Sequence, residues 1–269
     1  MATGTAGHSV VGGQIMTVYF IGAGPGAADL ITVRGQRILQ QAPVCLYAGS
    51  IMPTDLLELC PADARVIDTG PLTLAQIIDE IVAADRAGLD VARLHSGDPS
   101  IYSALAEQCR HLDAQGVHYE IVPGVPAFAA AAAALGRELT VPGVAQTVTL
   151  TRVATLSTAM PEKETLANVS IPGATLVLHL AAAQADTIVS ELTHPSTGGY
   201  NNETPCAAVA FASWPTEQVV RCRLGDLAGE LRSAGITKTA VIFVGDVLAA
   251  QGFSDSYLYS AGRRRGSRH

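Results

Sequence analysis

The stretch TVYFIGAGPGA, residues 17–27, decides the fold class of the N-terminal half. An apolar run, Thr17–Ile21, ends at glycine and enters the turn Gly22-Ala23-Gly24-Pro25-Gly26-Ala27. Similar apolar runs alternate with helical patterns further along the chain. The runs are Val44–Tyr47, Val91–His95 and His118–Val122, and the helical patterns are Thr32–Gln41, Thr73–Ala87 and Ile101–Gln115. This alternation predicts βαβ units around a mainly parallel sheet, whose buried strands are apolar on both faces.

The pattern changes after Pro123. An alanine-rich helix is expected at Ala127–Leu135, and fewer helices than strands follow, which favours a mixed sheet with antiparallel pairs. The expected strands are Thr147–Thr151, Thr175–Leu180, Cys206–Phe211, Val219–Arg223 and Thr239–Val244, and the expected helices are Gln184–Leu192 and Leu224–Ala234. We therefore predict two α/β domains, residues 16–123 and 124–260, with a small-molecule cleft between them. Residues 1–15 are expected to be a disordered leader or tag, and residues 261–269 a mobile tail.

The composition limits the classes of function. Hydrophobic residues make up 48% of the 269 residues and charged residues 15%, which supplies enough apolar material for a large core. The net charge of -7 argues against a nucleic-acid partner, because no basic field is available for phosphates. No apolar run reaches the roughly 20 residues of a membrane helix, so no membrane association is expected. Five scattered cysteines without a CxxC pair predict a reduced, cytoplasmic protein.

The glycine turn by itself allows more than one interpretation. It fits a dinucleotide-binding fingerprint if Ala27 replaces the third glycine. Two features argue against this: Pro25 lacks the N–H that such a turn donates, and the second strand runs into Tyr47-Ala48-Gly49 instead of an acidic residue. A tight turn that packs a strand against a helix remains the alternative.

A second polar loop follows the strand Val91–His95. It reads Ser96-Gly97-Asp98-Pro99-Ser100-Ile101-Tyr102, and ligands of open α/β sheets bind beyond the carboxyl ends of strands. Asp98 could accept a hydrogen bond from a ribose, or it could be a helix N-cap with Pro99 at the first helical position. His95 is either a general base or a structural histidine near a strand end.

Together, these motifs resemble those of the tetrapyrrole methyltransferases, a family that includes uroporphyrinogen-III and precorrin methyltransferases. The family pattern GxGPGxxxLxTxxG matches residues 22–35, GDPxxY matches Gly97–Tyr102, and PGxxxxxAAA begins at Pro123. Later matches are Thr175–Leu180, Ala212–Pro215, and Thr239–Ile242 with Gly245. The resemblance runs in order from residue 16 to about residue 260.

Within that family, several segments resemble the branch that methylates C-11 of precorrin-4. They are Tyr47–Ser50, His95–Tyr102 and Leu135–Pro142, continued by Gln146–Arg152 and Met160–Glu164. The same methylation of a cobalt-bearing precorrin-4 stays open, because a metal at the ring centre need not touch the protein. Two further hypotheses are methylation of another large substrate, such as a diphthine precursor, and a non-catalytic or dinucleotide-binding domain.

The resemblance implies a homodimer that holds S-adenosylmethionine in the cleft and acts on a tetrapyrrole, without a metal site. It assigns cofactor contacts to Pro25, Ser96, Gly97, Asp98, Ile101, Tyr102, Pro126, Ala127, Leu180, Ala212, Ser213, Thr239 and Ala240. Relatives often carry Met at the position of Leu180 and Thr or Ser at that of Pro126.

The substrate side is expected to need local cations, because the tetrapyrrole carries many carboxylates and the chain is acidic. Arg152 and Lys163 are the candidates for these carboxylates, with Tyr47, Ser50 and Met52 nearer the ring. Tyr47 and Tyr102 are the candidate catalytic residues. Lys163 with its glutamate neighbours could instead form a solvated face, and Tyr102 could instead pack in the core. Methyl transfer depends mainly on alignment of the reacting atoms, so no catalytic triad is expected.

Overall fold

The structure is a computed structural model that describes residues 16–154, 159–195, 197 and 199–256, with the side chain of Ser50 left out. The expected leader at residues 1–15 and tail at 261–269 lie outside the described residues. Internal contacts divide the chain into Met1–Pro126 and Ala127–His269, which we call the N-terminal and C-terminal domains. Gly124, expected to open the second domain, packs within the first, because its backbone N–H donates to Asp98.

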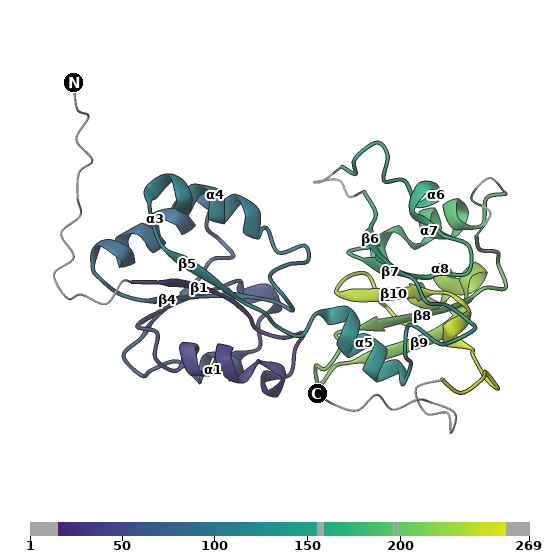
Figure 1. Ribbon diagram of the computed structural model, residues 1–269, viewed down its shortest axis with the longest axis horizontal. Helices are drawn as coiled ribbons and strands as arrows, with labels where there is room; N and C mark the ends of the chain where they lie inside the picture. Colours follow the sequence, from purple (N-terminus) through teal and green to yellow (C-terminus); the bar gives the residue numbers. More distant parts are fainter. Residues whose placement is uncertain (1–15, 155–158, 196, 198, 257–269) are drawn as a thin grey trace, which may run out of the picture. The chain divides into compact units, whose positions relative to one another are not determined.

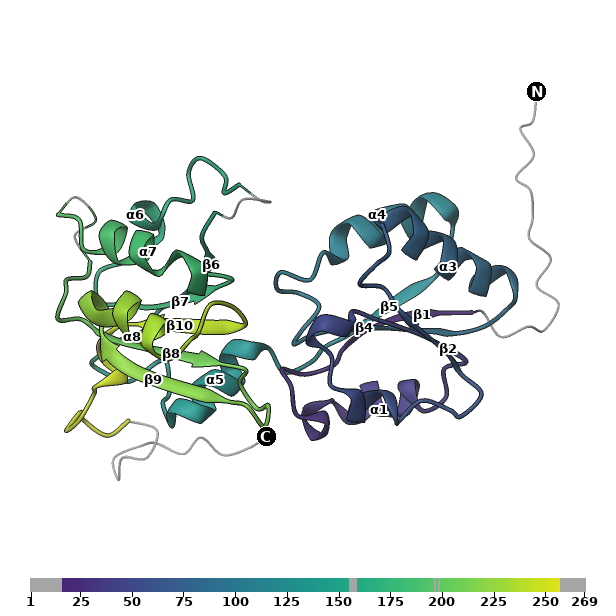
Figure 2. The ribbon, with the colours of Figure 1, turned by 180° about the vertical axis from the view of Figure 1, so that it is seen from behind.

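The N-terminal domain is a five-stranded sheet in the order β3-β2-β4-β1-β5, with every pair parallel. The strands are β1 (Val18–Gly22), β2 (Val44–Tyr47), β3 (Arg65–Asp68), β4 (Val91–His95) and β5 (Tyr119–Val122). The helices are α1 (Val33–Leu39), α2 (Thr54–Leu57), α3 (Leu74–Arg86) and α4 (Leu105–Gln115), with 3-10 turns at Ala28–Leu30 and Gly49–Ile51. Helix α1 covers one face of the sheet, and α3 and α4 cover the other (Figures 1 and 2).

The strand order of the N-terminal sheet contains a topological switch point between β1 and β4. The connection from β1 leads to β2, toward one edge of the sheet. The connection from β4 leads to β5, at the opposite edge. Because β1 and β4 are neighbours, the loops that leave their carboxyl ends diverge to opposite faces. Such a switch point is where open α/β sheets bind ligands.

Local sequence explains most of these elements. Strand β1 is apolar on both faces and packs into clusters above and below the sheet, as expected for a central parallel strand. Helix α1 begins after Thr32, whose hydroxyl accepts the N–H of Gly35, and α3 begins with a capping box between Thr73 and Gln76. The edge strand β3 was not predicted, because it is short and mostly exposed and therefore lacks an apolar signature.

The predicted helix Ile101–Gln115 starts too early. Helix α4 begins at Leu105, because residues 99–103 form turns and bends after β4. Tyr102 and Ala104 have φ angles of 52° and 54°, in the left-handed region that is incompatible with a continuing right-handed helix. Of the two alternatives for Asp98, the N-cap of this helix is therefore wrong, because Ala104 stands at that position.

The C-terminal domain has the mixed sheet that was predicted. Its order is β6-β7-β10-β8-β9, in which β6 and β7 are parallel and the other pairs are antiparallel. The strands are β6 (Val148–Arg152), β7 (Thr175–His179), β8 (Pro205–Ala210), β9 (Gln218–Arg223) and β10 (Ala240–Val244). Helix α5 (Ala127–Leu135) packs on one face of this sheet. Helices α6 (Leu166–Val169), α7 (Ala185–Leu192) and α8 (Leu227–Ser233) pack on the other face, and 3-10 turns lie at Ala182–Gln184, Leu224–Asp226 and Asp246–Leu248. Among the described residues, no helix has the length and apolar character needed to cross a membrane.

Candidate active site

Three loops meet at the carboxyl edge of the N-terminal sheet. The N–H of Ala23 donates to the carbonyl of His95 at 2.8 Å. Gly24 and Gly97 exchange two backbone hydrogen bonds, at 3.2 and 2.7 Å. The N–H of Gly124 donates to the Asp98 carboxylate at 2.7 Å. The loops after β1, β4 and β5 therefore form one hydrogen-bonded unit.

Glycine is required where these loops touch. A Cβ atom on Gly22 would lie 2.5 Å from the Cα atom of Gly124. A Cβ atom on Gly124 would collide with the carbonyl oxygen of Gly97. Neither position can accept a side chain without moving backbone, which explains the glycine at each of these motif positions.

The same contacts argue against a dinucleotide site. Such a site needs free backbone N–H groups in the turn and a helix N-terminus aimed at the pyrophosphate. Here the N–H groups of Ala23 and Gly24 are used within the protein, and Pro25 has none. Helix α1 starts only at Val33, after a separate 3-10 turn. The glycine turn therefore joins loops together instead of presenting amides to a phosphate.

Asp98 ties the loop after β4 to the loop after β5. One carboxylate oxygen accepts the N–H of Gly124, and the other accepts the N–H of Ser100 at 2.8 Å and the Ser100 hydroxyl. Partial burial acts to raise the pKa of this carboxyl, but the hydrogen bonds from Ser100 and Gly124 outweigh it and hold the pKa below its usual value. Asp98 is thus a carboxylate at neutral pH.

A second carboxylate organises the loop after β2. Oδ1 of Asp68, at the end of β3, accepts the N–H groups of Gly49 at 2.9 Å and Gly70 at 2.8 Å, and these bonds lower the pKa of the carboxyl. Tyr47 at the end of β2 is half-buried. Met52 is only 5% exposed and packs in the core of this domain. The side chain of Ser50 lies outside the described part of the chain.

The C-terminal domain gathers unusual backbone at one edge of its sheet. Leu180, Phe211, Ser213 and Thr239 have φ angles between 50° and 66°. Leu180 follows β7, Phe211 and Ser213 follow β8, and Thr239 precedes β10. Because β7 and β8 both run antiparallel to β10, these positions share one edge, where the N–H of Phe211 donates to the carbonyl of Thr239 at 2.9 Å.

Such conformations carry a cost for residues other than glycine, about 1–2 kcal/mol each, and they concentrate at ligand sites. The side chain of Leu180 is 61% exposed. An exposed leucine in a strained conformation gains nothing from the fold that would offset this cost. The edge therefore has the character of a binding surface.

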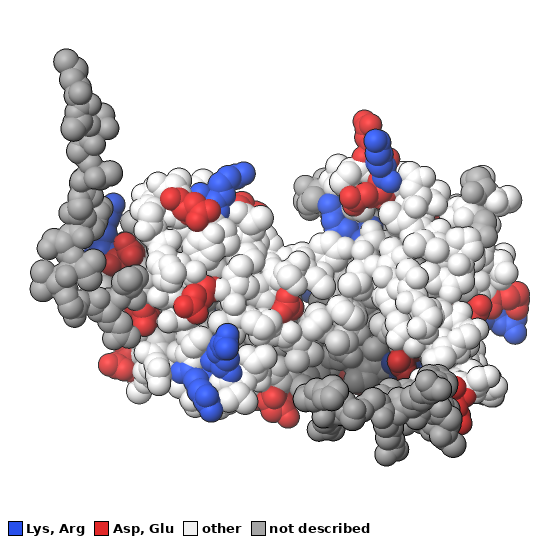
Figure 3. Space-filling view, viewed as in Figure 1, with Lys and Arg blue, Asp and Glu red and all other residues white. Residues whose placement is uncertain are grey.

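Arg152 reaches the same edge, because β6 pairs in parallel with β7 and Arg152 lies opposite His179. Its guanidinium donates to the carbonyls of Val153 at 3.2 Å and Ala159 at 2.8 Å. Lys163 lies exposed in the turn before α6. Acidic and basic side chains are interspersed on the face shown in Figure 3, so cations for an acidic ligand there would come from individual residues.

Two histidines at strand ends are buried. Desolvation, with the nearby Arg93 charge, lowers the pKa of His95 to about 4 although a hydrogen bond with the Ser103 backbone opposes this shift. Desolvation alone lowers the pKa of His179 to about 4. Both imidazoles are therefore neutral at pH 7, as expected for structural histidines. In the described part of the chain, no three His, Cys, Asp or Glu side chains form a group that could hold a metal.

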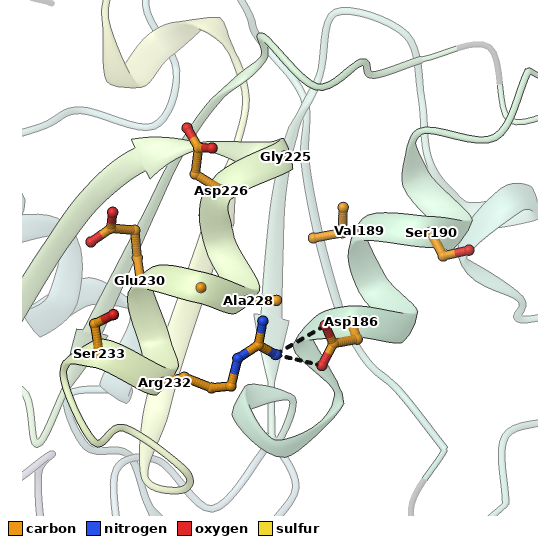
Figure 4. Close-up of a pocket in the computed structure, with 10 residues that line it drawn as sticks. Asp186, Val189, Ser190, Gly225, Asp226, Ala228, Glu230, Arg232 and Ser233 are labelled. Atoms are coloured by element: carbon orange, nitrogen blue, oxygen red, sulfur yellow. Dashed lines mark hydrogen bonds and ion pairs between the residues drawn. The ribbon is translucent and has the colours of Figure 1, made fainter.

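A hollow of about 560 Å³ lies between α7 and α8 of the C-terminal domain (Figure 4). Arg232, one of the residues that line it, donates to both carboxylate oxygens of Asp186, at 3.0 and 2.8 Å. None of the residues that line it is a predicted site residue. This hollow is therefore not the candidate site.

Comparison with known proteins identifies the family. Residues 17–228 match the family described as Tetrapyrrole (Corrin/Porphyrin) Methylases. The chain belongs to this family. The tetrapyrrole methylase is 71% identical over 248 residues to a precorrin-4 C(11)-methyltransferase of Mycobacterium tuberculosis, covering 92% of this chain and 98% of the relative.

Solved structures support the same grouping of this tetrapyrrole methylase. An X-ray structure of a cobalamin biosynthetic enzyme, cobalt precorrin-4 methyltransferase, aligns with a TM-score of 0.82 and 40% identity, over 87% of this chain and 96% of that one. A uroporphyrin-III C-methyltransferase from Thermus thermophilus, complexed with S-adenosyl homocysteine, aligns with a TM-score of 0.70 and 28% identity, over 86% of this chain and 93% of that one.

The structure sorts the predicted cofactor residues of the tetrapyrrole methylase into two groups. At the carboxyl edge of the N-terminal sheet lie Pro25, Ser96, Gly97, Asp98, Ile101 and Tyr102. At the edge of the C-terminal sheet where β7 and β8 end and β10 begins lie Leu180, Ala212, Ser213, Thr239 and Ala240. Pro126 and Ala127 stand where the two domains join in the chain. Pro25, Gly97, Ala212 and Ala240 are buried, and the others are half-buried or exposed.

Sequence reasoning missed the residues that hold these loops in place. Asp68 lies in the unpredicted strand β3, and the polar side chains of Arg93 and Gln108 are buried in β4 and α4. The one available signal was the charge of Arg93 within the apolar run Val91–His95, which the periodicity argument passed over.

Proposed function

We propose that this tetrapyrrole methylase transfers the methyl group of S-adenosylmethionine to C-11 of precorrin-4, giving precorrin-5 in cobalamin synthesis. The observation that carries the proposal is 71% identity to a precorrin-4 C(11)-methyltransferase over 98% of that protein. The solved cobalt precorrin-4 methyltransferase is 40% identical, which favours the metal-free substrate over the cobalt-bearing alternative.

S-adenosylmethionine is the proposed methyl donor, and its chemical groups suit both edges. The flat faces of its adenine pack well against apolar groups, which suits the exposed Leu180 and the small side chains of Ala212 and Ala240. Its hydroxyl and amino-acid groups suit the carboxylate of Asp98 and the hydroxyls of Ser213 and Thr239. Binding of S-adenosyl homocysteine by the Thermus thermophilus relative supports this assignment.

When bound, the cofactor supplies a methyl group made electrophilic by its sulfonium. The protein then has to align the reacting atoms and exclude water, and alignment alone contributes several kcal/mol to such reactions. We assign Tyr102, which is 46% exposed, and Tyr47 to contacts near the reacting atoms. Arg152 and Lys163 are assigned to the carboxylates of the tetrapyrrole, because fixed cations orient acidic ligands.

The test is methyl transfer by the purified protein. Protein is incubated with methyl-labelled S-adenosylmethionine and either precorrin-4, cobalt-precorrin-4 or uroporphyrinogen III, and the label is located by NMR of the macrocycle. We expect label at C-11 of precorrin-4. Label only in the cobalt-bearing ring supports the alternative substrate, and the absence of label in any ring from folded protein contradicts the proposal.

We further propose a homodimer in the cytoplasm. The dimer rests on the family resemblance, and light scattering of the purified protein tests it. The location is supported by the five cysteines, all of which are free thiols in the structure. Fractionation of cells that express the tagged full-length protein tests the compartment.

A further inference from the structure

Arg93 is a buried cation in the middle of the N-terminal sheet. It lies on β4, is 6% exposed, and shares the face of the sheet covered by α3 and α4 with His95, two residues further along the strand. Ion pairs within the described chain involve Arg65, Arg223 and Arg232, and none of them includes Arg93. Burial lowers its pKa to about 10, so it remains charged at neutral pH.

Burying a charged side chain in a core is energetically unfavourable. A buried charge without an opposite charge costs far more than an apolar side chain of the same volume, and replacing it by an apolar residue is often neutral or stabilising. The contacts of the guanidinium therefore have to explain why an arginine stands here.

The first contact leads to Tyr47. Nη1 of Arg93 donates to the hydroxyl oxygen of Thr69 at 3.0 Å. That hydroxyl donates to the carbonyl of Tyr47 at 2.9 Å, and the N–H of Thr69 donates to the same carbonyl at 2.7 Å. The Arg93 guanidinium is thus connected to the end of β2, where the candidate substrate-binding residue Tyr47 lies.

The second contact leads to the Tyr102 loop. Nε of Arg93 donates to Oε1 of the buried Gln108 at 3.1 Å, and Nε2 of Gln108 donates to the carbonyl of Ala104 at 2.9 Å. Ala104 and Tyr102 both have φ angles near 50°. The amide of Gln108 therefore holds the strained end of the loop that carries Tyr102.

We propose that Arg93 is a positioning residue, which holds the Tyr47 and Tyr102 loops in their binding geometry through Thr69 and Gln108. This role rests on the proposed function, because it takes Tyr47 and Tyr102 to contact ligands. A guanidinium suits the role because its rigid fork donates in two directions at once. A lysine at this position would provide a point charge without that fork.

Two variants separate positioning from stability. In the double variant Arg93→Met with Gln108→Leu, cation and partner are both replaced by apolar side chains of similar size, so a Tm equal to or above that of the parent protein is expected. Thr69→Val breaks only the Tyr47 branch. Ile81→Val is the matched control, because Ile81 is fully buried in the apolar cluster between α3, α4 and the sheet, and its side chain cannot form a hydrogen bond with this network.

The first measurement is amide hydrogen exchange without any ligand, which does not depend on the reaction. We expect faster exchange both in residues 98–104 and near residue 47 of the double variant, faster exchange only near residue 47 in Thr69→Val, and neither change in Ile81→Val. The second is affinity for S-adenosylhomocysteine by calorimetry. We expect the Kd to rise about tenfold in the double variant and less than twofold in Thr69→Val, in line with the loss of one or two hydrogen bonds at the cofactor loop.

Unchanged exchange in both segments, or faster exchange with unchanged affinity and unchanged KM for both substrates, overturns the proposal. If the double variant does not fold, Thr69→Val decides through exchange near residue 47 and the KM for the tetrapyrrole. Failure of the parent protein to methylate precorrin-4, together with the expected changes in exchange, rejects the proposed substrate and leaves the positioning role supported.

Discussion

The carboxylate of Asp98 accepts the backbone N–H of Gly124 at 2.7 Å, which joins the loop after β4 to the loop after β5. These loops are far apart in sequence and carry two of the motifs that resemble the tetrapyrrole methylases. This hydrogen bond holds the two motifs together at one edge of the N-terminal sheet.

Replacing Asp98 by asparagine removes the charge from this connection. We expect the free energy of unfolding to fall by about 1–3 kcal/mol, because backbone N–H groups lose a charged acceptor. We also expect weaker binding of S-adenosylhomocysteine. Urea unfolding and calorimetry measure the two effects. Asp79→Asn, at an exposed position of α3, is the control, and equal effects in both variants would contradict the assignment.

Gly22→Ala tests the contact between the loops after β1 and β5. A Cβ atom there would lie 2.5 Å from the backbone of Gly124, so we expect a loss of about 1–3 kcal/mol of stability from overpacking. Gly229→Ala is the opposite control: Gly229 lies inside α8 with no atom within 4 Å of an added Cβ, and alanine should stabilise the helix by up to about 1 kcal/mol. Denaturant titration of both variants checks the two signs.

Leu180→Asn should separate stability from binding. Asparagine tolerates the left-handed conformation of this position better than leucine, so stability should stay equal or rise by up to about 1 kcal/mol. Loss of the exposed apolar side chain should weaken binding of S-adenosylhomocysteine. Leu89→Asn, at an exposed leucine of the N-terminal domain, is the control. Unchanged affinity in Leu180→Asn would remove this residue from the cofactor site.

Acid should destabilise the protein between pH 6.5 and about 4. His95 and His179 have pKa values of about 4 when folded and 6.5 when unfolded, so in this window only the unfolded chain binds the extra protons. Their contribution to stability is complete above pH 6.5 and is lost as the pH falls toward 4. The loss is on the order of 3 kcal/mol for each histidine at most.

The measurement is urea unfolding at pH values across this window. In His95→Gln the free energy of unfolding should fall less steeply with decreasing pH than in the parent protein. In His111→Gln, at an exposed position of α4, this dependence should not change. Asp68 and Asp98 have pKa values below 3.8, so their stabilising effect is present above that pH and is lost only in stronger acid. An unaltered slope in His95→Gln would show that this imidazole is not responsible.

Several elements were predictable because their sequence signals are local. Apolar runs identified β1, β2, β4 and β5, and the helical patterns that begin at Thr32 and Thr73 matched α1 and α3. The excess of strands over helices beyond residue 142 indicated the mixed sheet. Strand β3 and the start of α4 were missed, because a short edge strand lacks an apolar pattern and the left-handed residues Tyr102 and Ala104 have no distinctive side-chain type.

The sequence by itself determined the family and the two α/β domains and predicted the positions of the candidate site, because motif residues and hydrophobic periodicity are read one segment at a time. Only the tertiary structure decided that the amides of the glycine turn are used within the protein, that four strained residues share one sheet edge, and that Arg93 connects the Tyr47 and Tyr102 loops. Each of these depends on strand order and register, which bring together residues far apart in the chain. Hydrogen bonds over such separations leave no periodic signal in the sequence.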